Sequence, residues 1–198
     1  PFRERREVRC IRRAIQSIAA GGDVLDLPCG TGRLIPILAQ GGFHVTAADA
    51  SPHMVELARF RWCEIGQENC PTASQVEFAV REVLDTGFEN DRFDGVICNR
   101  LFHHFNESET RIAVLRELAR ISRGPIIVSF FNSFALDAVK FRLKHAWRRT
   151  TPTDRIPISL QIFEGEIQVA GLEVVARYAV MWGLSPMWYV TLQRKPGE

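Results

Sequence analysis

Short apolar runs alternate along this chain with stretches in which apolar residues recur every three or four positions. The short runs are predicted strands and cover residues 24–27, 43–48, 76–80, 95–99 and 126–131. The stretches with helical spacing are predicted helices. The first contains Ile11, Ile15 and Ile18 and ends at Gly21 and Gly22, and the others cover residues 32–39, 52–65, 108–121, 134–149 and 159–170. Repeated alternation of strand and helix predicts an α/β fold, in which a mostly parallel sheet is covered by helices on both faces.

Local signals mark several boundaries of these elements. Ser51 and Pro52 form an N-cap followed by proline at the first helical position, which begins the helix over 52–65. Two final strands are predicted near residues 173–181 and 187–193. The five residues between them are short enough for an antiparallel hairpin. We therefore expect about seven strands, the last two of them antiparallel.

Composition places the chain among ordinary globular proteins. Its 198 residues fit one domain spanning 1–198, with 46% hydrophobic and 24% charged residues. Five scattered cysteines without CxxC spacing argue against a disulfide framework or a zinc site, and they favour a reducing cytoplasm. No apolar run approaches the roughly 20 residues that span a bilayer. The chain begins at Pro1 without an initiator methionine, so an upstream segment could contribute to a site.

The residues with chemical potential fall at the carboxyl ends of the predicted strands, where open parallel sheets bind ligands. Residues 26–32 leave the first strand with the sequence DLPCGTG and enter a helix. Gly30 and Gly32 allow a sharp turn and a close approach of the backbone to a ligand. Asp26 would attract an ammonium group and repel a diphosphate. This combination suits an amino-acid ligand.

Further polar groups follow the next three strands. Asp49 ends the second strand, where a carboxylate can accept both hydroxyl protons of a ribose. Residues 81–83 follow the third strand and could enclose a flat ring, and Asn99 ends the fourth strand. An acid near an ammonium, an acid near a ribose and a slot for a base together describe an amino-acid nucleoside.

The stretches VLDLPCGTGR, VTAADASPHMVELAR and VEFAVREVLDTGFENDRFDGVICNRLFHHF, in this order, resemble the motif series of class I S-adenosylmethionine-dependent methyltransferases. Within this class, the stretches are most similar to those of the broad group that includes the quinone-biosynthesis methyltransferases. The resemblance covers about residues 23–131. It implies a Rossmann-like, doubly wound sheet, S-adenosylmethionine as the cofactor and S-adenosylhomocysteine as the product.

The resemblance also assigns roles to individual residues. Asp26, Gly30 and Gly32 would hold the methionine part, Asp49 the ribose, Glu82 and Val83 the adenine, and Asn99 the face near the sulfonium. Leu27, Thr31 and Ala50 complete the expected cofactor-binding set, and no metal is expected. Two residues depart from the family pattern: Pro28 replaces a common glycine and removes one N–H, and Glu82 stands where Asp or Asn is commoner.

His103 and His104 follow the fourth strand. An imidazole titrates near neutral pH, so either residue could act as general base, with His103 as the first choice. The alternative is that one caps the next helix while the other packs under the cofactor. Cys29 and Cys98 are expected to pack as small hydrophobes and not to react.

The segment 134–149 is the least generic part of the chain, and about 134–158 could be an insertion that covers the substrate. An apolar stripe lies beside cations at i+4 spacing, formed by Leu136, Val139, Leu143 and Trp147 with Lys140, Lys144 and Arg148. Together with Phe163, Trp182 and Trp188, this segment suggests a small-molecule or lipid-like acceptor with apolar surface and an acidic group. The stripe would also suit peripheral membrane contact, or packing of an ordinary surface helix on the sheet.

Three other functions remain for comparison. A nicotinamide dehydrogenase would need GxGxxG, but Ile35 occupies the third glycine position. A nucleic-acid methyltransferase is suggested by arginines near the start of the chain, but residues 99–102 read NRLF and lack the (N/D)PP(Y/F) tetrapeptide. We therefore expect no nucleic-acid partner. A cofactor-binding protein that acts as a regulator or scaffold stays open, as do the methylated atom and the oligomeric state.

Overall fold

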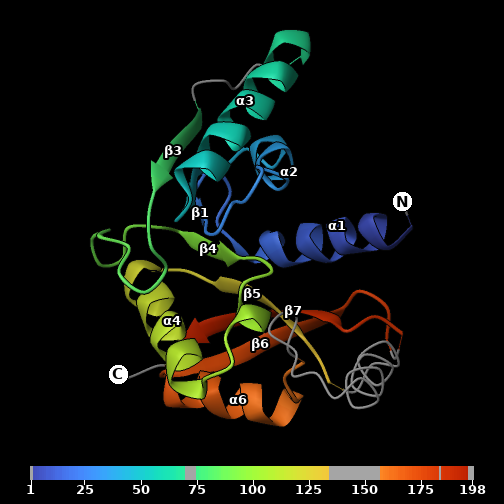
Figure 1. Ribbon diagram of the computed structural model, residues 1–198, viewed down its shortest axis with the longest axis vertical. Helices are drawn as coiled ribbons and strands as arrows, with labels where there is room; N and C mark the ends of the chain where they lie inside the picture. Colours follow the sequence, from blue (N-terminus) through green and yellow to red (C-terminus); the bar gives the residue numbers. More distant parts are fainter. Residues whose placement is uncertain (1, 70–74, 134–156, 183, 196–198) are drawn as a thin grey trace. The chain divides into compact units, whose positions relative to one another are not determined.

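The protein is described by a computed structural model that covers residues 2–69, 75–133, 157–182 and 184–195. Its sheet has the strand order β3-β2-β1-β4-β5-β7-β6 (Figure 1). The strands are β1 (Asp23–Asp26), β2 (His44–Asp49), β3 (Val76–Val80), β4 (Gly95–Cys98), β5 (Ile126–Phe131), β6 (Leu172–Ala179) and β7 (Met187–Arg194). The β1–β2, β2–β3 and β1–β4 pairs are parallel, whereas β6 and β7 are antiparallel. The expected α/β sheet with a C-terminal antiparallel pair is confirmed.

The helices follow the sequence pattern with a few shifts at their ends. They are α1 (Phe2–Ala14), α2 (Ile35–Gln40), α3 (Pro52–Asn69), α4 (Ser108–Ile121) and α6 (Leu160–Val169), with 3-10 turns η1 (Ile15–Ser17) and η3 (Phe102–His104). The Ser51 hydroxyl accepts a hydrogen bond from the Met54 N–H at 3.4 Å, as expected for an N-cap. The helix predicted over 134–149 lies outside the described residues.

The second helix begins later than its sequence suggests. A start at Gly32 was predicted, but α2 begins at Ile35. The reason is local, because Gly30 and Gly32 have φ of 52° and 78°, which no α-helix accommodates. The first helix also ends at Ala14, before Gly21 and Gly22, which were expected to stop it.

The chain forms two compact units. Unit 1 comprises Pro1–Gln16, Arg100–Arg116 and Ile127–Glu198, and unit 2 comprises Ser17–Asn99 and Glu117–Ile126. Both units draw on separated parts of the sequence. Helix α4 contributes its first turns to unit 1 and its last turn to unit 2. The prediction of one domain over 1–198 stays a prediction.

Unit 2 is built around the first strands of the sheet. Helices α2 and α3 contact β2, and α3 also contacts β3. Their shared core is an apolar cluster of Cys29, Ile35, Ala39, Ala47, Ala58 and Trp62. Because apolar side chains from the helices and from β2 meet there, the backbone at the ends of β1 and β2 has a fixed support.

Unit 1 is built around the hairpin at the end of the chain. Helix α1 contacts β6 and β7, and α6 contacts β6. Phe163 is fully buried, with its ring centroid 5.2 Å from that of Phe102 and 4.6 Å from that of Phe130. Phe163 was expected near an acceptor, but it is a core residue. No helix of the described residues is long and apolar enough to cross a membrane.

Candidate active site

The loop between β1 and α2 is tied to strands on both of its sides. The Leu27 N–H donates to the Ile97 carbonyl of β4 at 2.9 Å, and the Cys29 N–H donates to the Ala48 carbonyl of β2 at 2.8 Å. The Leu27–Pro28 peptide bond is cis. Pro28 has no N–H, so the loop is anchored through its neighbours Leu27 and Cys29, at the end of β1 where the strand order reverses.

The two glycines of this loop have different surroundings. A Cβ on Gly32 would lie 3.0 Å from Ile35 Cδ1 and 3.1 Å from Ala58 Cβ, so Gly32 permits close packing of α3. A Cβ on Gly30 would meet nothing within 4 Å. Both have positive φ, but only Gly30 presents its backbone to open space. Of the two, Gly30 is the glycine that a ligand could approach closely.

Asp49 orders the backbone at the end of β2. Its carboxylate accepts a hydrogen bond from the Gly30 N–H at 2.9 Å and one from the Ser51 N–H at 3.0 Å. Its carbonyl accepts the Arg81 N–H at 3.0 Å, which brings the residue after β3 beside it. Each carboxylate oxygen has a further lone pair, so Asp49 can still accept hydrogen bonds from a ligand.

Asp26 is a buried carboxylate with no hydrogen bond to its side-chain oxygens from any described residue. Its exposed fraction is 1%. Burial, and then the neighbouring carboxylate of Asp49, raise the pKa of Asp26 to about 8. A buried acid that receives no hydrogen bond from the described residues is energetically suited to a cationic donor on a ligand.

The cysteines beside these acids are poor nucleophiles. Burial, followed by the charges of Asp26 and Asp49, raises the pKa of the Cys29 thiol to about 12. Burial and Asp26 also raise the pKa of Cys98. Since the thiolate is the reactive form, both cysteines stay protonated near neutral pH and pack as apolar groups, as expected from the sequence.

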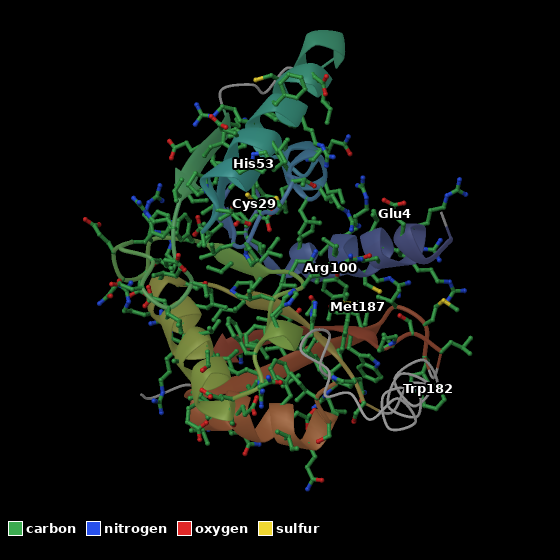
Figure 2. The ribbon with its side chains drawn as sticks, viewed as in Figure 1. Glu4, Cys29, His53, Arg100, Trp182 and Met187 are labelled. Atoms are coloured by element: carbon green, nitrogen blue, oxygen red, sulfur yellow. The ribbon has the colours of Figure 1, made fainter. Side chains whose placement is uncertain are left out.

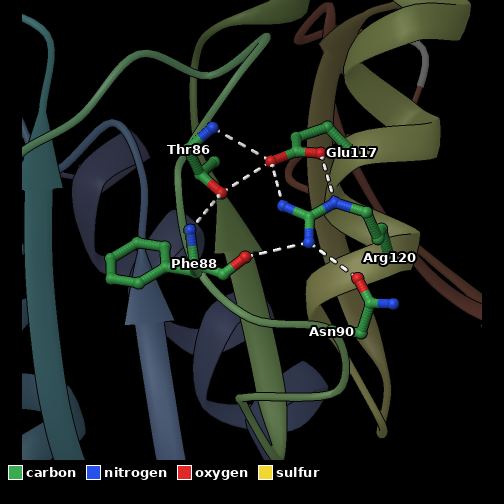
Figure 3. Close-up of polar contacts among 5 residues, drawn as sticks. All are labelled: Thr86, Phe88, Asn90, Glu117 and Arg120. Carbon is green, nitrogen blue, oxygen red and sulfur yellow. Dashed lines mark hydrogen bonds and ion pairs between the residues drawn. The ribbon is translucent and has the colours of Figure 1, made fainter.

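The loop after β3 is fastened to the last turns of α4 (Figure 3). Thr86 donates to the Glu117 carboxylate through its N–H at 2.9 Å and through its hydroxyl at 2.6 Å. Arg120 binds the same carboxylate at 2.7 and 2.8 Å and donates to the Phe88 carbonyl at 2.8 Å. Both ends of this network belong to unit 2. It fixes the loop that carries exposed Glu82 and half-buried Val83.

Arg100 directly follows Asn99 and has an unusual backbone. Its φ is 59°, a left-handed conformation that costs a non-glycine residue about 1–2 kcal/mol. Its N–H donates to Ser129 Oγ at 2.7 Å. Its guanidinium lies beside α1 (Figure 2) and binds both oxygens of Glu7 at 3.0 and 2.7 Å. Tyr189 donates its hydroxyl to Glu7 at 2.9 Å.

His103 and His104 lie in η3 of unit 1 and differ in exposure. His103 is 4% exposed and stacks on Phe131, with ring centroids 4.1 Å apart and an interplanar angle of 7°. His104 is exposed to solvent, and its ring centroid lies 4.2 Å from that of His103. The first histidine is held as part of the core, whereas the side chain of the second is accessible to solvent.

Arg111 lies in the first turn of α4, after the histidine turn, and forms a buried ion pair. Arg111 donates to both carboxylate oxygens of Glu166 in α6, one of them at 2.9 Å, and to the Phe105 and Asn106 carbonyls at 2.8 and 3.0 Å. Ser108 also donates to Glu166, at 2.7 Å. Because the guanidinium and the carboxylate satisfy each other, the loop between η3 and α4 has a defined course.

The residues predicted to bind the cofactor are all in unit 2, whereas the two histidines are in unit 1. The structure brings Asp26, Gly30 and Asp49 together, and Arg81 joins them through its backbone. Of the remaining predicted residues, Leu27 is buried, Thr31 and Asn99 are half-buried, and Ala50 is exposed. No group of three or more His, Cys, Asp or Glu side chains among the described residues could hold a metal ion.

Sequence reasoning missed the carboxylates that organise these loops. Glu166 has no local signal, because Arg111 lies 55 residues away, and the contact of Glu117 with Thr86 spans 31 residues; only the i,i+3 pair of Glu117 with Arg120 is local. Glu7 does have a local signal in the sequence, because it lies four residues before Ile11, on the apolar face that continues to Ala14 and Ile18. A carboxylate at a core position of an amphipathic helix indicates a buried partner.

Comparison with known families agrees with this geometry. Residues 24–124, just over half of the chain, match the family model described as a methyltransferase domain. The chain belongs to this methyltransferase family. Its fold and motifs make it a class I S-adenosylmethionine-dependent methyltransferase domain.

Two curated relatives resemble the domain over part of their own length. The ubiquinone biosynthesis O-methyltransferase of Xanthomonas oryzae pv. oryzae is 33% identical over 127 residues, which are 61% of this chain and 49% of the relative. The probable tRNA methyltransferase 9B of Mus musculus is 31% identical over 111 residues, which are 56% of this chain and 22% of the relative. The chain thus spans half or less of the length of these proteins.

A solved structure matches the fold of the methyltransferase domain almost throughout. Magnesium protoporphyrin IX methyltransferase from Synechocystis PCC 6803, crystallised with bound S-adenosylhomocysteine, superposes with a TM-score of 0.77 at 19% identity. The match covers 98% of this chain and 84% of the other. At this identity the likeness concerns the fold.

The residues present fit S-adenosylmethionine. The carboxylate of Asp26, which accepts no hydrogen bond from a described residue, suits the ammonium group of its methionine part, since a buried acid is stabilised by a cationic donor. The open backbone face at Gly30 accommodates a close approach, and Asp49 has lone pairs left for ribose hydroxyls.

Proposed function

We propose that this protein transfers a methyl group from S-adenosylmethionine to an oxygen atom of a small or amphiphilic acceptor with apolar surface and an acidic group. The observation that carries the proposal is the pair of buried acids at the ends of β1 and β2, one of which has no donor among the described residues. The name of the Xanthomonas relative, an O-methyltransferase of ubiquinone biosynthesis, supports oxygen as the acceptor atom.

The proposed cofactor-binding residues sit at or just after the carboxyl ends of β1 to β4. Asp26 would accept hydrogen bonds from the ammonium group, Asp49 from the ribose hydroxyls, and Glu82 from the adenine amino group, beside the apolar contact of Val83. Asn99 would lie near the sulfonium. The set comprises Asp26, Leu27, Gly30, Thr31, Gly32, Asp49, Ala50, Glu82, Val83 and Asn99.

His104 is the proposed general base. S-adenosylmethionine supplies a methyl group on a positively charged sulfur, which is already activated for direct attack. His104 would take the proton of the acceptor hydroxyl as the new C–O bond forms, while the electron pair of the broken C–S bond stays on sulfur. Exposure favours His104 over His103, because the latter is buried against Phe131.

The test combines binding with methyl transfer. Calorimetry with S-adenosylhomocysteine should show binding to the wild-type chain and strongly weakened binding to Asp49→Ala. Transfer from radiolabelled S-adenosylmethionine should be measured with caffeic acid, with a catechol that carries a decyl chain, and with bulk tRNA. We expect methylation of a catechol, with loss of turnover in His104→Ala and little change in cofactor affinity.

His44 provides a matched control, since it is an exposed histidine at the opposite end of β2 from Asp49. His44→Ala should keep full turnover. Absence of heat with millimolar S-adenosylhomocysteine would refute cofactor binding. Binding without transfer to either catechol would favour the regulatory alternative, and methylation of tRNA alone would assign the acceptor to nucleic acid.

A further inference from the structure

We propose that Glu7 is a positioning residue for methyl transfer, which acts by holding Arg100 in its left-handed conformation directly after Asn99. The inference rests on the proposed function, because Asn99 and His104 are assigned to the reaction there. Glu7 itself is not expected to touch the cofactor or the acceptor.

Both carboxylate oxygens of Glu7 accept hydrogen bonds. Arg100 binds them in a bidentate pair, and Tyr189 adds a third hydrogen bond, from residues 93 and 182 positions away in the sequence. Glu7 is only 5% exposed. A buried carboxylate with three donors is held in one place, so it can act as a fixed anchor for the flexible side chain of Arg100.

The conformation of Arg100 needs such an anchor. A left-handed non-glycine residue persists only where its surroundings oppose relaxation. Here the N–H is held by Ser129 and the guanidinium by Glu7, so the backbone and the side chain are fixed separately. A glycine would adopt the same φ without strain, but it would have no side chain to connect this turn to α1.

The stretch that begins at Arg100 contains the histidine turn and is fastened at its other end too. Arg111 is bound by Glu166 of α6. Carboxylates from two helices that are far from η3 in the sequence therefore hold Arg100 and Arg111, the two arginines on either side of η3. Loss of Glu7 would release the end that adjoins Asn99 and leave the end at Arg111 in place. The expected effect is a displaced His104 with cofactor residues that stay intact.

The experiment compares the 198-residue chain with Glu7→Ala, Glu7→Ala/Arg100→Gly and the surface control Arg5→Gln on the same helix. Backbone hydrogen exchange is followed at Arg100, His104 and Phe105, whose N–H groups are hydrogen-bonded to Ser129, Leu101 and Phe102. The affinity for S-adenosylhomocysteine and the transfer of methyl to the catechol probes are measured on the same samples.

We expect faster exchange at these amides in Glu7→Ala, unchanged exchange in β1 to β3, an S-adenosylhomocysteine Kd within about threefold of wild type, and turnover lowered about tenfold or more. The glycine at position 100 should restore protection and most of the turnover, because it adopts the left-handed turn without help. Arg5→Gln should match wild type.

Uniformly faster exchange in Glu7→Ala would overturn the proposal, as would the absence of recovery in the double variant, because both indicate a general role in stability. The hydrogen-exchange measurement requires no methyl acceptor. If neither catechol is methylated, the proposed function fails, while exchange at Arg100 still decides whether Glu7 holds the turn.

Discussion

Glu117 accepts two hydrogen bonds from Thr86, one from the backbone N–H and one from the hydroxyl, at 2.9 and 2.6 Å. Thr86 is 1% exposed, so neither of its donors can turn to water instead. The loop that carries Glu82 and Val83 therefore depends on a carboxylate from α4. This dependence makes the loop sensitive to acid.

Stability should fall at low pH through Glu117. Its ion pair with Arg120 and its bonds from Thr86 lower its pKa from 4.5 to about 2. A carboxyl whose folded pKa is depressed stabilises the fold above its unfolded value, and this contribution is lost as the pH falls from about 4.5 to 2. Arg120 is partly exposed, so the contribution is about 1 kcal/mol after allowance for solvent screening. Urea unfolding at a series of pH values should show a shallower acid limb in Glu117→Gln; identical profiles would contradict the assignment.

Cofactor affinity should rise with pH through Asp26. Its pKa near 8 means that the acid is mostly protonated at neutral pH, and an ammonium ligand requires the ionised form. Binding of S-adenosylhomocysteine should then release a proton. The Kd should fall by up to about tenfold per pH unit from about pH 6 to pH 8 and level off above. Calorimetry in buffers of different ionisation enthalpy measures the released proton, and Asp26→Asn should bind weakly and without this pH dependence.

Asp26 should also affect the stability of the free protein in the opposite sense. Because its folded pKa is raised, the unfolded chain loses this proton first, and the free energy of unfolding decreases as the pH rises from about 4 to 8. Asp26→Asn removes the titrating group. Its stability should therefore exceed that of the wild type most clearly near pH 8, and saturating S-adenosylhomocysteine should reverse the order.

The two loop glycines should respond differently to alanine. Gly32→Ala adds strain at φ 78° and a Cβ within 3.0 to 3.2 Å of Ile35 and Ala58, so we expect a loss of about 2–3 kcal/mol in folding stability. Gly30→Ala has comparable backbone strain but no close neighbour, and should cost about 1–2 kcal/mol. Its methyl group would occupy the open side, so its S-adenosylhomocysteine Kd should rise about tenfold, or about 1.4 kcal/mol. Equal effects on stability would contradict this division.

Removal of Arg111 alone should destabilise the protein more than removal of Arg111 together with its partner Glu166. Arg111 and Glu166 are 5% and 4% exposed. Arg111→Ala leaves a buried carboxylate unpaired and should lower the free energy of unfolding by about 3–5 kcal/mol. Arg111→Met/Glu166→Leu replaces both charges with apolar groups of similar volume, so urea unfolding should show a smaller loss. A larger loss in the double variant would indicate that the pair stabilises more than its burial costs.

Sequence patterns predicted the elements whose boundaries are local. Strand β3, helix α4 and strand β5 have the predicted ends, since amphipathic period and capping residues act within a few positions. The predicted start of α2 was wrong, because the positive φ angles of Gly30 and Gly32 delay the beginning of the helix. The expected cofactor-binding residues were named from ordered motifs, and their role stays a prediction; the structure shows Asp26, Gly30 and Asp49 together.

Long-range pairings could not be predicted in the same way. Glu7 with Arg100, Glu117 with Thr86 and Arg111 with Glu166 are separated by 93, 31 and 55 residues. Each depends on packing of a whole element, which no local pattern encodes. The proposed part of residues 134–149 in acceptor binding stays a prediction, because these residues lie outside the described ones.

The interleaved course of the chain has a consequence for engineering. Residues 17–126 hold all of unit 2 and almost exactly bracket the family match over 24–124, but they also carry 100–116 of unit 1. Cut out as a gene fragment, this stretch would contain Arg100 without Glu7 and Arg111 without Glu166. The part of the chain that defines the family by its motifs is thus not a transplantable module. A chimaera that exchanges it would have to bring α1 and α6 from the same parent.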